Sequence, residues 1–185
     1  LCEKLARVDN VVLYIGSGVG KASMQIMEFI NLTGANFVTS PTGKGWVDEN
    51  HPLYRGVYGF AGHESATALL QDPNLDLILA VGTDLGELGT SGWKGDLLNT
   101  KLVHIDSSIE HFTRSPMANL HVFGNIDVIF EQLLINVRDA RKWGKSWETL
   151  HPASERNING GYTTLREPEK CFSNDSPVKP QRLMN

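Results

Sequence analysis

Three apolar runs, each followed at once by glycine or aspartate, constrain the fold of this chain more than any other feature. Residues 11–15 lead into a glycine-rich turn, residues 75–81 lead into Gly82, and residues 102–105 end at Asp106. Apolar runs of this length, separated by helical patterns, are typical of strands buried on both faces of a parallel sheet. Ligands of such sheets bind in the crevice at the carboxyl ends of the strands. The pattern therefore predicts an α/β fold with the frame of a nucleotide-type site.

The remaining elements follow from apolar spacing and from punctuation by glycine and proline. Apolar residues recur at helical spacing between residues 126 and 137, and a shorter stripe over residues 21–33 ends at Gly34. Residues 46–58 show no period and are predicted to be irregular. The predicted helices cover residues 1–8, 21–33, 63–71 and 126–137, and the predicted strands cover residues 11–15, 36–40, 75–81, 102–105 and 120–123.

Composition argues against several classes of function. The net charge of -4 gives no sign of the basic face that nucleic-acid binding usually needs. No apolar stretch reaches the ~18 residues that span a bilayer, so no membrane partner is expected. Cys2 and Cys171 form no CxxC pair and offer neither a disulfide framework nor a metal site. This cysteine usage is typical of a reducing compartment, and we expect a cytoplasmic protein.

The chain divides into a domain and a tail of different character. Residues 1–142 carry the periodic elements, whereas residues 143–178 are rich in Asn, Gly, Ser, Pro and Glu. That composition predicts a linker or a segment that wraps around the domain. Residues 179–185 look like the start of another element, and the chain begins without an initiator Met. We therefore expect a piece of a longer protein.

A glycine-rich turn, Gly-Ser-Gly-Val-Gly-Lys at residues 16–21, joins the first predicted strand to a helix. Small residues there let the backbone approach a phosphate, and the start of a helix favours an anion. GxGxxG fails because it needs glycine in place of Lys21, and a P-loop fails at Ile15 and Ala22. These failures argue against a stand-alone NAD-dependent or P-loop enzyme. Ligand contact and a tight turn that uses glycine for packing alone remain equally open.

Several polar residues have both a functional and a structural interpretation. Asp106 could accept a hydrogen bond from a ribose hydroxyl, but an N-cap or Asx-turn role is favoured. His63 lacks the second histidine of HExxH and is interpreted as a solvated or capping residue. His104 lies within an apolar strand and is interpreted as a core histidine with its hydrogen bonds satisfied. Asp84 and Glu87 could perform acid-base chemistry, but a solvated loop is the favoured interpretation.

The order and spacing of these loops resemble the central domain of thiamine-diphosphate-dependent enzymes of the acetolactate synthase and pyruvate oxidase type. The resemblance covers roughly residues 1–138. Its most specific part is Gly-Lys-Gly at residues 43–45, followed by His-Pro-Leu-Tyr at residues 51–54. Residues 179–184 resemble the opening of that family's pyrophosphate-binding domain. The other matching pieces are residues 11–18, 32–34, 48–50, 56–59, 76–82, 104–106 and 124–126.

The resemblance implies a Rossmann-like, three-layer α/β domain with a roughly six-stranded parallel sheet. In this family the central domain lies between two catalytic domains, which hold thiamine diphosphate and Mg²⁺. The resemblance therefore implies a non-catalytic domain, without catalytic or metal-binding residues of its own, that spaces those two partners. The parent would be a homo-oligomeric lyase, decarboxylase or carboligase acting on a 2-oxo acid.

The alternative is an FAD- or ADP-binding module within such an enzyme. Flavin-binding members of the family usually carry a His in the loop that corresponds to residues 59–62 and an Arg just after the third-strand glycine. Here Ala61 and Thr83-Asp84 hold those places, and an acidic group near a diphosphate is unfavourable, which argues against FAD. If a cofactor binds, the expected contacts are Gly16, Ser17, Gly18, Gly59, Gly62, Gly82, Thr83, Asp106 and Asn125.

Overall fold

Six parallel strands form the centre of the domain in the computed structural model, which describes residues 1–139. The strands are β1 (Val11–Ile15), β2 (Asn36–Thr39), β3 (Tyr54–Val57), β4 (Leu77–Val81), β5 (Leu102–Asp106) and β6 (Leu120–Phe123). They pair in the order β3-β2-β1-β4-β5-β6, and every pair is parallel. This order places the topological switch point between β1 and β4. The predicted Rossmann-like α/β fold with a six-stranded parallel sheet is confirmed.

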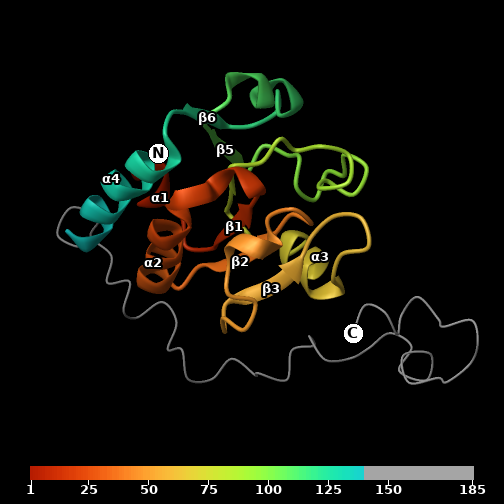
Figure 1. Cartoon of the computed structure of the whole chain (residues 1–185), viewed down its shortest axis with the longest axis horizontal. Helices are drawn as coiled ribbons and strands as arrows, with labels where there is room; N and C mark the ends of the chain where they lie inside the picture. Colours follow the sequence, from red (N-terminus) through yellow and green to blue (C-terminus); the bar gives the residue numbers. More distant parts are fainter. Residues whose placement is uncertain (140–185) are drawn as a thin grey trace, which may run out of the picture.

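Helices cover both faces of the sheet and make the fold three-layered. Figure 1 shows α1, α2 and α4 on one side of the sheet and α3 on the other. The chain also forms three short 3-10 helices, two of which follow β1 and β5 directly. The helices are α1 (Cys2–Leu5), α2 (Ser23–Thr33), α3 (Glu64–Leu70) and α4 (Ile126–Arg138), with the 3-10 segments η1 (Ser17–Ala22), η2 (Lys44–Trp46) and η3 (Ile109–Arg114).

Side chains that alternate along the central strands supply two separate cores. Leu13 and Ile15 of β1 join a core under α1, α2 and α4, whereas Val12 and Tyr14 join the core on the α3 side. This alternation explains why the central strands are apolar at nearly every position, since each face is covered. In the first core, the rings of Phe29 and Phe130 pack edge to face, with their centroids 5.6 Å apart. The predicted apolar faces of both long helices are confirmed, although Ile129 is only partly buried.

The strand β3 was predicted to be irregular, and that prediction is wrong. It lies at one edge of the sheet and pairs only with β2, with a register shift between Phe37 and Thr39. Gly56 has φ of +98°, and a Cβ there would lie 2.7 Å from the His63 ring. A short edge strand with a glycine in this conformation carries little of the alternating apolar signal from which strands are predicted.

Other differences are confined to the ends of elements. The chain after β1 forms η1 before α2 begins at Ser23, so the predicted helix over residues 21–33 starts as a 3-10 turn. The domain predicted over residues 1–142 includes all of these elements. The predicted linker at residues 143–178 and the predicted new element at 179–185 lie outside the described residues. Within residues 1–139, no helix is both long enough and apolar enough to cross a membrane.

Candidate functional site

The loops after β1 and β4 meet at the switch point of the sheet, where a nucleotide-type site was predicted. The Gly16 N–H donates to the Val81 carbonyl at 2.9 Å, and the Gly18 N–H donates to the Gly82 carbonyl at 2.8 Å. A Cβ on Gly16 would lie 2.2 Å from the Gly82 oxygen and 2.6 Å from the Thr83 Cβ. The structure thus brings Gly16, Gly18, Gly82 and Thr83 together as two backbones in direct contact, with Ser17 exposed beside them.

The loop that holds Gly59 and Gly62 is bound to the segment after β4 instead. The Phe60 N–H donates to the Leu88 carbonyl at 2.7 Å, and a Cβ on Gly59 would lie 2.4 Å from that same oxygen. The Gly62 N–H closes the turn on the Gly59 carbonyl at 3.0 Å. These glycines therefore permit two loops to approach each other at the carboxyl edge of the sheet.

His63 begins α3 and holds the same loop in place. Its Nδ1 accepts a hydrogen bond from the Val57 N–H at 2.9 Å, and its side chain makes no capping bond to α3. The histidine is half-buried and is the N-cap residue of α3, as predicted, although its side chain does not bond to the helix. A hydrogen bond to the backbone end of β3 gives it a structural role.

An ion pair links the loops that follow β4 and β5. The Asp84 Oδ2 lies 2.6 Å from the Arg114 Nη1, which also donates to the Asp84 carbonyl at 3.1 Å. Asp84 Oδ1 accepts from the Gly86 N–H at 3.2 Å. Both charged side chains are about half exposed. The carboxylate predicted to lie in a solvated loop is therefore tied to an arginine 30 residues away.

Asp106 is the one predicted site residue with a buried polar atom left open. Its Oδ1 accepts from the Ser108 N–H at 2.7 Å, which is the Asx-turn contact that was predicted. Its Oδ2 lies 3.1 Å from His111 Nδ1 and 3.9 Å from His104 Nε2. Although Asp106 Oδ2 and His111 Nδ1 lie close together, both atoms are buried and neither has a hydrogen-bond partner among the described residues. The carboxylate at the end of β5 can therefore accept one further hydrogen bond.

His104 is fully buried in β5, and its hydrogen bonds fix its proton. Its Nε2 lies 2.8 Å from the Thr83 carbonyl, which can only accept, so Nε2 carries the hydrogen. Its Nδ1 then accepts from the Ser115 hydroxyl at 2.9 Å, and that oxygen lies 3.0 Å from His121 Nε2. Burial lowers the pKa of His104, which keeps the imidazole neutral. The prediction of a satisfied core histidine is confirmed.

Asn125 lies apart from the glycine contacts, at the start of α4. It is exposed and is the N-cap of that helix, without a side-chain capping bond. The neighbouring Gly124 N–H donates to the Asp106 carbonyl at 3.1 Å, which connects this turn to the end of β5. Asn125 therefore lies at the same edge of the sheet as the other predicted site residues.

Sequence reasoning did not identify the partners of these residues. His111 and Arg114 come from η3, a segment without a motif, and Ser115 and His121 follow within ten residues of His111. Their spacing matches no known metal or nucleophile pattern. Among the described residues, no three His, Cys, Asp or Glu side chains converge on a point where a metal ion would fit.

Comparison with known proteins defines the family. A family model described as "Thiamine pyrophosphate enzyme, central domain" matches residues 1–133. The acetolactate synthase of Mycobacterium avium is 29% identical over 132 residues, covering 70% of this chain and 21% of its own length. Isozyme 2 large subunit of the acetolactate synthase of Escherichia coli strain K12 is 25% identical over 133 residues, covering 71% of this chain and 24% of its own length.

A third relative extends the match beyond the described domain. A probable acetolactate synthase large subunit of Methanococcus aeolicus is 24% identical over 187 residues, which cover 97% of this chain and 30% of its own length. The chain thus spans between about a fifth and a third of these relatives. The structure defines the class of the domain as Rossmann-like α/β, with the loops after β1 and β4 in backbone contact at the carboxyl edge of the sheet. The chain belongs to the family of thiamine-pyrophosphate-enzyme central domains, and it is homologous to acetolactate synthase large subunits.

Proposed function

We propose that this chain is the non-catalytic central part of a thiamine-diphosphate-dependent lyase, decarboxylase or carboligase that acts on a 2-oxo acid. Its role is to space and dock two flanking catalytic domains. The observation that carries this proposal is the backbone contact of Gly16 and Gly18 with Gly82, which occupies the switch point with the protein's own atoms. The homology to acetolactate synthase large subunits supplies the reaction class.

The Mg²⁺ of the proposed parent does not fit the described residues. Magnesium prefers oxygen ligands in octahedral geometry, usually carboxylates together with phosphate and water. Within residues 1–139, no cluster of three acidic or histidine side chains is available for a metal ion. The proposal therefore assigns Mg²⁺, together with thiamine diphosphate, to flanking domains of the parent.

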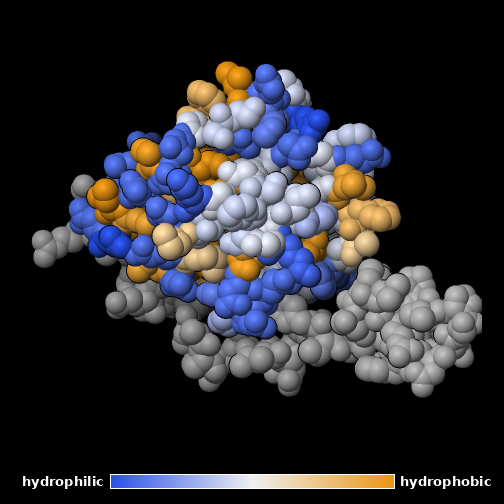
Figure 2. Space-filling view, in the orientation of Figure 1, coloured by the Kyte–Doolittle hydropathy of each residue, from blue (hydrophilic) through white to orange (hydrophobic). Residues whose placement is uncertain are grey.

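An exposed hydrophobic surface at the carboxyl edge supports the docking role. Phe60, Leu88 and Trp93 are 71%, 64% and 55% exposed. Phe60 and Leu88 are held side by side by their backbone hydrogen bond. Figure 2 shows hydrophobic groups gathered at the right of the view, near the loop between β4 and β5. Large exposed apolar groups on anchored loops are typical of an interaction surface.

Binding of FAD or ADP, the alternative role, has less support. Ala61 and Thr83-Asp84 stand where flavin-binding relatives carry His and Arg, and the nearby Arg114 is already paired with Asp84. The open Oδ2 of Asp106 is the single feature in favour, because it could accept a ribose hydroxyl. We propose a cytoplasmic, homo-oligomeric parent without bound flavin.

Activity of the intact parent tests this proposal. The purified parent should convert a 2-oxo acid such as pyruvate only with thiamine diphosphate and Mg²⁺, while residues 1–185 alone should bind neither in calorimetry. Phe60→Ser with Leu88→Ser should lower the parent's activity, whereas Ile135→Ser, on the exposed face of α4, should not. Cofactor-independent turnover, or micromolar binding by the isolated chain, would contradict the assignment. A yellow protein that loses its colour in Asp106→Ala would favour the flavin alternative.

A further inference from the structure

The two edges of the sheet differ in how well they are protected against further strand pairing. An edge strand presents unpaired N–H and C=O groups, and proteins commonly protect it with a charged side chain or an irregular backbone. The β3 edge has both. Arg55 Nη1 donates to the Pro52 carbonyl at 2.8 Å and to the Tyr54 carbonyl at 3.1 Å, and Gly56 has φ of +98°. This edge is therefore poorly suited to receive another strand.

The β6 edge has neither form of protection. Residues 117–126 contain no Lys, Arg, Asp or Glu, and the four residues of β6 pair with β5 in a continuous register. Among the described residues, no strand lies on the other side of β6. Every residue of β6 is exposed or partly exposed, whereas each of the other strands contains buried residues. The outer edge of β6 is thus regular, uncharged and accessible.

Both faces of β6 already have packing partners, which leaves its outer edge as the free part of the strand. Leu120 and Val122 pack against the core under α4. On the opposite face, the His121 ring stacks on Phe112 with centroids 4.7 Å apart, and His121 Nε2 donates to the Ser115 carbonyl at 3.0 Å. These contacts hold β6 in place, which lowers the entropic cost of pairing with another strand.

We propose that β6 of a second copy of this chain pairs with this edge, so that two six-stranded sheets become one continuous sheet across a two-fold axis. An extended backbone complements the alternating donors and acceptors of a strand edge. Such an edge is complementary to itself in the antiparallel direction, which is the direction that a two-fold axis imposes on two copies. Because residues 117–126 carry no charged side chain, the two edges approach without repulsion between like charges of the strands.

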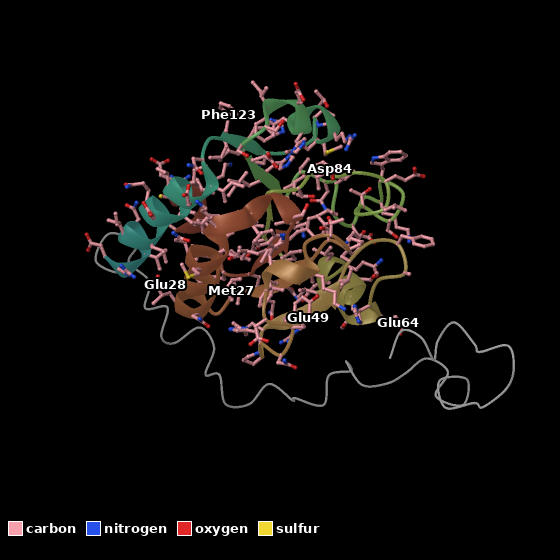
Figure 3. The ribbon with its side chains drawn as sticks, viewed as in Figure 1. Met27, Glu28, Glu49, Glu64, Asp84 and Phe123 are labelled. Carbon is pink, nitrogen blue, oxygen red and sulfur yellow. The ribbon has the colours of Figure 1, made fainter. Side chains whose placement is uncertain are left out.

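The side chains of β6 indicate the register of this pair. Residues directly opposite each other in antiparallel strands lie on the same face, and His121 and Phe123 share one face of β6. A register centred on Val122 places Phe123 across from the partner's His121. Phe123 is 62% exposed and lies at the rim of the domain in Figure 3, so its ring is available for this aromatic contact. The interface is small, and we expect a dissociation constant on the order of micromolar.

Sedimentation of residues 1–185 under reducing conditions tests the proposal. The unmodified chain should pass from monomer to dimer as its concentration rises through the micromolar range. Phe123→Lys places a charge on the edge and should weaken the dimer by about tenfold or more. Val128→Lys, at a 51% exposed position of α4, is the matched control and should leave the dissociation constant unchanged. A chain that stays monomeric throughout, or equal weakening by both variants, would overturn the proposal.

Hydrogen exchange then locates the interface. The amides of residues 120–123 should exchange more slowly as the concentration of the unmodified chain rises, and this protection should be absent in Phe123→Lys. The amides of residues 54–57, at the β3 edge, are the internal reference and should exchange at the same rate at every concentration. Equal circular dichroism spectra check that both variants fold. A dimer that protects a different segment, such as the loops with Phe60 and Leu88, would overturn the proposal. Self-association is measured without cofactor or substrate, so a negative result would leave the proposed spacing function untouched.

Discussion

The amide of Gly18 donates a 2.8 Å hydrogen bond to the carbonyl of Gly82, so the turns after β1 and β4 are joined backbone to backbone. Gly82 has φ of +59°, and a Cβ there would lie 2.6 Å from the Val19 nitrogen. Both glycines are therefore required by close packing at the switch point. This contact uses an amide that a phosphate ligand would otherwise need.

Replacing Gly16 by Ala should destabilise the domain. The new methyl group would meet the Gly82 oxygen at 2.2 Å, and backbone atoms there have little room to move. Overpacking of this kind typically costs about 1–3 kcal/mol. Denaturant unfolding measures the change. Gly95→Ala is the matched control, because a Cβ at Gly95 meets nothing within 4 Å, and equal loss in both variants would refute the packing argument.

Phe130→Ala should weaken the core between α4 and the sheet. The Phe130 side chain is fully buried and meets Phe29 edge to face. Removal of a buried phenyl ring costs about 3–5 kcal/mol. Val128→Ala, on the exposed side of the same helix, should change the unfolding midpoint little. A small effect of Phe130→Ala would indicate that α4 is peripheral to folding.

Stability should fall in mild acid because of His104. Burial lowers the pKa of His104 in the folded state, whereas the unfolded chain titrates near pH 6.5. Below that pH the unfolded state binds a proton that the folded state resists, so stability is present above about pH 6.5 and is lost as the pH falls. His104→Asn should show a smaller decline of unfolding free energy from neutral pH to mild acid. A wild-type profile that is flat over this range would contradict the argument.

At alkaline pH, Tyr58 should produce the opposite dependence. Burial, together with the nearby carboxylate of Asp96, raises the pKa of Tyr58 to about 12. An unfolded tyrosine ionises near pH 10, so stability is complete below about pH 10 and is lost as the pH rises toward the folded pKa. Tyr58→Phe should lose less stability over this range. Thermal unfolding of both proteins measures the difference in stability between them. That difference should not change with pH near neutrality and should change only above about pH 10.

The ion pair of Asp84 with Arg114 should contribute little to stability. Both side chains are about half exposed, and pairs of this kind contribute about 0.2–1 kcal/mol. A double-mutant cycle with Asp84→Asn and Arg114→Gln should give a coupling in that range that shrinks with added salt. Coupling that is larger and independent of salt would show that the pair is effectively desolvated.

The central strands were predictable because burial on both faces leaves a continuous apolar run, as in β4. The two long helices were predictable because each buries one stripe. The edge strand β3 was not, since half of its pairing is missing and Gly56 removes a side chain from the pattern. Local patterns therefore predict the elements whose burial leaves a regular apolar pattern in the sequence, and they miss an edge strand that lacks one.

The candidate site was predictable only as a set of strand ends. The positions of Gly16, Gly82 and Asp106 at one edge follow from parallel topology alone. Their partners do not, because His111 approaches Asp106 through a short 3-10 helix without a sequence signature. Contacts between separate loops depend on how the chain folds back, and spacing along the sequence carries no trace of them.

Helix α1 and helix α4 pack against the same face of the sheet, and the N-terminus lies beside α4 in Figure 1. Because α1 precedes β1 and α4 follows β6 in a parallel sheet, both ends of the described part lie at the edge opposite the strands' carboxyl ends. Phe60 and Leu88 are therefore exposed on the side of the domain that faces away from its first and last described residues.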